Sequence, residues 1–78
     1  MDIVIIGHRN NKPTQTSFLS SATAKDISDR VYSYFNHGNG SDTVSIVYND
    51  GEIISINSPT KLAAAIAIIT HATGYASR

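Results

Sequence analysis

The stretch TVSIVYNDGEIISIN, residues 43 to 57, constrains the fold more than any other part of this sequence. Two arms rich in β-branched residues flank the dipeptide Asp50-Gly51, which is typical of a two-residue type I′ turn between antiparallel strands. Each arm has one apolar face, made of Val44, Ile46 and Tyr48 in the first arm and of Ile54 and Ile56 in the second. The stretch therefore predicts a β-hairpin, and another element has to cover its apolar face.

The N-terminus predicts a second hairpin. IVII, residues 3 to 6, is a β-branched run ended by Gly7, and such a run is typical of a strand that is buried on both faces. RNNKP, residues 9 to 13, has the composition of a turn. The next residues, 14 to 19, alternate, with Thr14, Thr16 and Phe18 on one side and Gln15, Ser17 and Leu19 on the other. We expect two paired strands, the first of them central or well covered.

The segment that follows this hairpin has helical periodicity. Ser21 or Thr23 is placed to cap the start of a helix, and Gly38 is placed to end it. Its apolar side chains fall within one narrow arc at 100° per residue: Ala24, Ile27, Val31, Tyr34 and Phe35. The segment predicts an amphipathic helix that packs on the sheet.

The last helix is predicted from KLAAAIAIITHATGY, residues 61 to 75, with Ser58 as its N-cap, Pro59 at the first helical position and Gly74 at its end. On a helical wheel, one face carries the bulky side chains Leu62, Ile66, Ile69 and Thr73. The far side is made of small residues with one isoleucine, Ile68, which is flanked by Ala64, Ala65 and Ala72. A small-residue face lets another backbone approach closely. That neighbour is either the first helix or the same helix of a second copy.

The predicted elements follow the order ββαββα, and 78 residues leave room for a single compact domain, residues 1–78. We expect an α+β two-layer sandwich, in which a four-stranded and mostly antiparallel sheet carries two helices on one face. The second face of the sheet would be open to water or to a partner. The order of the strands in the sheet stays open.

The charge balance argues against nucleic acid as a partner. Six Lys or Arg residues cancel six Asp or Glu residues, whereas binding to phosphates requires a basic face. The apolar run in MDIVIIGH is too short for a signal peptide, and no segment reaches the ~20 apolar residues of a membrane span. We therefore expect a cytoplasmic protein without a membrane association. The chain has no cysteine, so disulfides cannot stabilise it.

The sequence contains no pattern that we can assign to catalysis or to a cofactor. His8, His37 and His71 have no spacing typical of metal ligands. The glycines of NHGNGSD follow a predicted helix and precede a strand, which is the reverse of a phosphate-binding loop. No serine lies in a nucleophile elbow. We expect a protein that is not an enzyme and that has no metal and no cofactor.

Association with another protein is the function that the composition favours. A domain of this size buries only roughly 60% of its unfolded surface, so a partner often adds stability. Tyrosine and arginine are enriched in interface hot spots. The expected interface residues lie on the outward side of the first helix, in the second hairpin and on the last helix: Asp29, Arg30, Tyr32, Tyr48, Ala64, Ile68, His71 and Tyr75.

We therefore expect a non-enzymatic protein–protein interaction module. Its size suits a small inhibitor of the kind that phages and mobile elements encode, which sterically blocks a larger host enzyme or a defence complex such as a CRISPR effector. The alternative is a structural or regulatory subunit that acts through homo-oligomer assembly, for example as a homodimer. A small ligand-binding or nucleic-acid-binding domain is less favoured.

Overall fold

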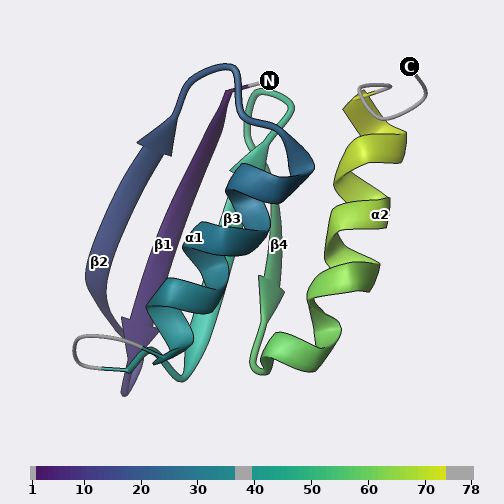
Figure 1. The fold of residues 1–78 in the computed structure, drawn as a ribbon. Coiled ribbons are helices and arrows are strands. Elements are labelled where there is room, and N and C mark those ends of the chain that lie inside the picture. Colours follow the sequence, from purple (N-terminus) through teal and green to yellow (C-terminus); the bar gives the residue numbers. More distant parts are fainter. Residues whose placement is uncertain (1, 37–39, 74–78) are drawn as a thin grey trace.

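The computed structural model describes residues 2–36 and 40–73 and has the predicted α+β order ββαββα (Figure 1). Both helices lie on the same side of the four-stranded sheet. The elements are β1 Ile3–Arg9, β2 Lys12–Leu19, α1 Ala24–Asn36, β3 Thr43–Tyr48, β4 Glu52–Ile56, a 3₁₀ turn η1 Pro59–Lys61 and α2 Leu62–Thr73. Neither α1 nor α2 has the length and hydropathy that a helix needs to cross a bilayer.

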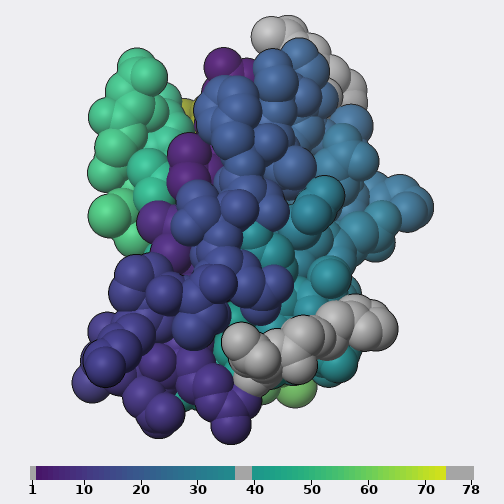
Figure 2. Space-filling view, turned by 90° about the vertical axis from the view of Figure 1, so that its left-hand side faces the viewer, coloured from purple at the N-terminus to yellow at the C-terminus, as the bar shows by residue number. Residues whose placement is uncertain are grey.

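The strands lie in the order β2-β1-β3-β4, and every neighbouring pair is antiparallel. β1 is therefore a central strand, as its apolar sequence predicted. β2 and β4 form the two edges of the sheet. Figure 2 looks at the β2 edge, with α1 on one side and the green β3–β4 hairpin on the other.

Both hairpins turn at asparagines. The turn between β1 and β2 has Asn10 and Asn11 in the left-handed region, with φ of 54° and 65°. The turn between β3 and β4 is centred on Asn49 and Asp50, with φ of 48° and 61°, so the prediction that Asp50-Gly51 forms its centre was wrong by one residue. Gly51 is instead the last residue of this turn, with φ of 121°, and its N–H closes the turn by donating to the carbonyl of Tyr48 at 3.1 Å. Asparagine tolerates the left-handed region well enough to allow this shift.

The core lies between the two helices and the sheet. Ile27, Val31 and Tyr34 are the buried residues of α1, as its periodicity predicted. The helix starts with a capping box, because the N–H of Asp26 donates to Thr23 Oγ1 at 3.1 Å and the N–H of Thr23 donates to Asp26 Oδ2 at 2.9 Å. Of the two predicted caps, Thr23 is the one used. The predicted caps Gly38 and Gly74 lie outside the described residues.

α2 buries a face that differs from the predicted one. Its buried residues are Leu62, Ala65, Ile69 and Thr70, whereas Ile66 and Thr73 are only half-buried. Assigning Ala65 to the open small-residue face was wrong, because α2 contacts α1 as well as β4 and the small side chain lies within the core. Ile68 is 50% exposed, so α1 does not cover it. Ser58 caps the 3₁₀ turn η1 that leads into α2, with its Oγ accepting from the N–H of Thr60 at 3.3 Å. The predicted α-helical position of Pro59 therefore lies in this turn, and α2 begins at Leu62.

Candidate protein-binding surfaces

The face of the sheet that is turned away from the helices carries a row of apolar residues. Val4 pairs with Phe18 on one side and with Val47 on the other, and Val47 pairs with Ile53. Residues that are directly opposite each other in a sheet point to the same face. Phe18, Val4, Val47 and Ile53 therefore form one line across all four strands, which we call the apolar row. In Figure 2, purple atoms of β1 are visible between β2 and the β3–β4 hairpin on this side of the molecule.

The ends of the apolar row are well exposed. Phe18 at the β2 edge is 64% exposed, and Ile53 at the β4 edge is 63% exposed. Val4 and Val47, in the middle, are half-buried. The prediction that residues 3–6 are buried on both faces was wrong, because both helices lie on one side of the sheet. An antiparallel sheet with one solvated face normally has polar residues on that face, so the apolar row is unusual.

A row of hydrogen-bonded polar side chains lies on the same face. The Oγ atom of Ser45 is 3.3 Å from Nε2 of His8 and 2.8 Å from the Oγ atom of Ser55. These three residues come from β1, β3 and β4, so their contacts fix side chains across the strands. Within residues 2–36 and 40–73, no three His, Asp or Glu side chains gather in a way that could hold a metal ion.

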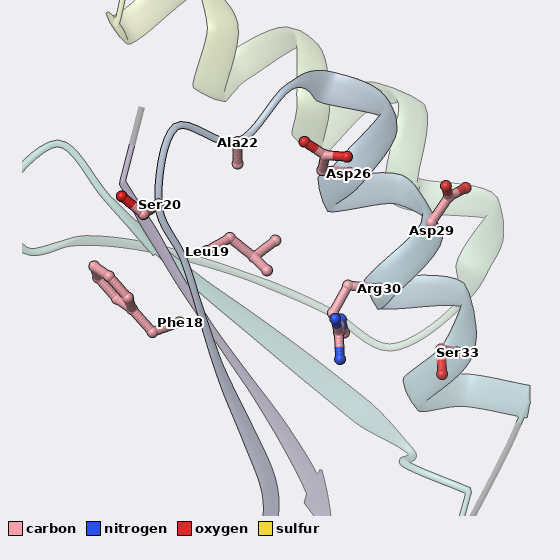
Figure 3. Close-up of a pocket in the computed structure, with 8 residues that line it drawn as sticks. All are labelled: Phe18, Leu19, Ser20, Ala22, Asp26, Asp29, Arg30 and Ser33. Carbon is pink, nitrogen blue, oxygen red and sulfur yellow. The ribbon is translucent and has the colours of Figure 1, made fainter.

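A groove of about 470 Å³ lies beside the β2 edge (Figure 3). We call it the β2–α1 groove, and its lining residues are Phe18, Leu19, Ser20, Ala22, Asp26, Asp29, Arg30 and Ser33. Figure 3 shows Leu19 pointing toward α1 and Phe18 pointing away from it. Phe18 and Leu19 are the last two residues of β2, so the groove lies at the C-terminal end of this edge strand.

The two carboxylates of the β2–α1 groove already have partners in the chain. Asp29 Oδ2 lies 2.7 Å from Lys25 Nζ, and this hydrogen bond raises the pKa of Lys25. Asp26 accepts the backbone N–H of Thr23, which lowers the pKa of that carboxyl. Among the described residues, no hydrogen bond or ion pair is found for the side chain of Arg30, which is exposed. Its side chain extends from α1 into the space between the helix and β2 (Figure 3).

The interface residues predicted from the sequence are divided between separate surfaces. Asp29 and Arg30 both line the β2–α1 groove, and Tyr32 is 47% exposed on the same helix. Tyr48 is only 8% exposed and lies within the core, because its position in β3 points to the helix-facing side.

The remaining predicted interface residues belong to the end of the chain. Ala64, Ile68 and His71 are exposed on α2, which the sheet separates from the apolar row. Tyr75 lies outside the described residues, as does His37.

Sequence reasoning missed the apolar row as a surface. The signal was present in the consecutive apolar residues of IVII and of Ile53 with Ile54, since neighbouring residues in a strand point to opposite faces. Phe18 was correctly placed opposite Leu19 by alternation. The two helices were already predicted to lie on one face. What the sequence lacked was the strand order and register that place these four residues in one line.

A comparison with protein-family models, with curated proteins and with solved structures finds no match for this chain.

Proposed function

We propose that this chain is a non-enzymatic protein-interaction module that docks on a larger protein through the open face of its sheet. The observation that carries the proposal is the apolar row, with Phe18 and Ile53 each more than three-fifths exposed at its ends. Contiguous exposed apolar surface is typical of protein-binding sites. A polar rim also fits such a site, and the bonded row of His8, Ser45 and Ser55 supplies one.

The size of the open face supports a partner that also reaches neighbouring surfaces. Four strands span about 19 Å at the usual strand spacing, and five residues span about 17 Å, which gives roughly 330 Å². A stable interface buries about 800 Å² on each partner. The open face therefore supplies less than half of a standard interface, and a larger protein would have to extend past an edge of the sheet.

In its finer form, the proposal is a steric inhibitor of the kind that phages and mobile elements encode. The body measures 36 × 23 × 16 Å, which is enough to obstruct a substrate channel of a host enzyme or of a defence complex such as a CRISPR effector. This form is supported by the small size, the balanced charge and the exposed apolar row. It requires no chemistry from the chain itself.

The second candidate is a regulatory or structural subunit that assembles with copies of itself. It is favoured by the same apolar row, because two such faces can pack on each other about a two-fold axis. The net charge of +0 offers little electrostatic protection against self-association. In this case the partner is a second copy of the chain, and the oligomeric state in solution distinguishes this candidate from the first.

Two isoleucine variants test the proposal with matched chemistry. Ile53→Ser changes the open sheet face and Ile68→Ser changes the exposed side of α2, where the side chain is 50% exposed. We expect Ile53→Ser to weaken capture of a stoichiometric partner from the native host about 5- to 30-fold. This loss corresponds to roughly 1–2 kcal/mol, the binding free energy gained when a partner buries the exposed part of the Ile53 side chain. Ile68→Ser should retain capture.

The opposite pattern would move the binding site to α2 and overturn the proposal for the sheet face.

Sedimentation velocity at about 100 μM distinguishes binding to a larger protein from self-assembly. A dimer that Ile53→Ser dissociates supports self-assembly, whereas a monomer removes that candidate.

A further inference from the structure

The β2–α1 groove lies between α1 and the C-terminal end of an edge strand, where an added β-strand can pair. β2 is an edge strand, so one row of its backbone N–H and C=O groups has no strand beside it in the described part of the chain. Lys12 and Pro13 stand at the start of β2, but the rest of the strand, Thr14 to Leu19, contains none of the lysines or prolines that usually protect an edge. Extended peptides bind such edges by main-chain hydrogen bonds, and neighbouring side-chain contacts give specificity.

The side chains of α1 that line the groove determine which side chains a bound strand would need. Asp26, Arg30 and Ser33 follow each other at intervals of four and three residues, so they lie along one side of α1. Four residues of helix rise about 6 Å, and alternate residues of a strand are about 6.8 Å apart. Two alternate side chains of one added strand can therefore meet Asp26 and Arg30 at the same time.

The direction of α1 sets the order of the two charges. β2 and α1 run in opposite directions (Figure 1). A strand that pairs antiparallel with β2 runs in the same direction as α1, so it passes Asp26 before Arg30. Antiparallel pairing is the commoner kind and is the only kind in this sheet.

We infer that the β2–α1 groove binds an extended segment of another protein, in antiparallel pairing with β2, that carries a basic residue followed two positions later by an acidic residue. The acidic side chain pairs with Arg30, and the basic side chain lies beside Asp26. Phe18 and Leu19 contact the apolar parts of the segment at the end of the groove.

A second copy of the chain does not fit this site through the same edge. β2 carries Lys12 but no Asp or Glu, so the β2 strand of a second copy has no carboxylate for Arg30. The inference rests on the proposed function only in that the partner is a protein. It uses the edge strand and α1, whereas the proposed function uses the open face, and Phe18 is the residue that the two sites share.

Peptide binding tests the site directly. The probe is a fluorescein-labelled octapeptide of threonine and valine with Lys at position three and Glu at position five, and the control peptide exchanges these two residues. By fluorescence anisotropy with the full chain, we expect the probe to bind about fivefold more tightly than the control, the effect of a well-placed exposed ion pair. Equal binding of the two peptides, or no binding at millimolar concentration, overturns the inference.

Charge reversal at Arg30 gives the second arm. Arg30→Glu should lose about fivefold in affinity for the probe and regain it for a peptide with Lys at both positions. Thermal unfolding confirms that the variant folds. An unchanged affinity would show that Arg30 does not recognise the segment.

Ile53→Ser separates this inference from the proposed function. It should leave peptide binding unchanged, because Ile53 lies at the opposite edge of the sheet from β2. If it abolished peptide binding, the peptide would bind the open face. The inferred site would then be wrong, while the proposed function would stand.

Discussion

Gly7 occupies a place in β1 where even one added methyl group has no room. A Cβ atom at this position would lie 2.4 Å from Oγ of Ser41 and 2.9 Å from Cδ2 of Tyr34. Both neighbours are buried, at 6% and 3% exposure. Ser41 could rotate its hydroxyl, but Tyr34 is held by the packing of α1 on the sheet. Gly7→Ala therefore forces α1 away from β1 or displaces the ring.

The magnitude follows from two opposing effects. Overpacking a well-packed core costs about 1–3 kcal/mol. Replacing glycine by alanine restricts the unfolded chain, which returns about 0.4–1 kcal/mol. We expect Gly7→Ala to lower the free energy of unfolding by about 1–2 kcal/mol. For a domain of this size each kcal/mol changes Tm by about 4–8 °C, so Tm should fall by roughly 5–15 °C.

Thermal unfolding followed by circular dichroism measures the change, and a second substitution identifies its cause. Ser41→Gly removes the closer of the two contacts, so the double variant Gly7→Ala with Ser41→Gly should recover at least about 0.5 kcal/mol beyond additivity. Gly51→Ala is the matched control. Its φ is 121° and no atom lies within 4 Å, so it destabilises through the backbone alone and should not couple to Ser41. A Gly7→Ala protein as stable as wild type would refute the close packing.

Two further predictions concern α1. Asp26 has a pKa below its ordinary value of 3.8 because it accepts the Thr23 N–H, so its contribution to stability is complete above that value and is lost as the pH falls through the lowered folded-state pKa. Asp26→Asn should therefore have a lower free energy of unfolding than wild type at neutral pH, and the difference between the two proteins should disappear in acid. A difference that stays constant across the pH range would contradict this. Tyr34→Phe removes a hydroxyl that bonds Ser17 Oγ and lies 3.5 Å from the carbonyl oxygen of Ile5. The substitution should lower the free energy of unfolding in urea by about 1 kcal/mol and leave the m value unchanged. An unchanged urea midpoint would show that the hydroxyl contributes nothing to stability.

The elements were predictable because their signals are local. The two hairpins are marked by turn residues between β-branched runs, and α1 and α2 are marked by caps and periodicity. The strand order was not predictable, because β1 pairs with β2 nearby and with β3 more than thirty residues away. Pairing across such a distance depends on the fit of whole faces, which no short pattern encodes.

The misassigned face of α2 has a similar physical origin. A helical wheel weights residues by bulk, so it counted Ala65 as small and open. In the fold Ala65 is 1% exposed, because a small side chain is what allows α2 to lie close to its neighbours. The contribution of a small residue to packing depends on what lies opposite it, and that information is tertiary.

The apolar row raises the question of whether it stabilises the fold or serves a partner. Cross-strand apolar pairs contribute roughly 0.2–1 kcal/mol each, which gives the half-buried pair Val4 and Val47 a structural reason to be apolar. That reason is weakest at the ends of the row, where Phe18 and Ile53 remain more than 60% exposed and have a strand on only one side. Polar residues at both ends would preserve most of the stability and would improve solubility. Substitution of Phe18 or Ile53 should therefore change the affinity for a partner while leaving the stability of the fold nearly unchanged.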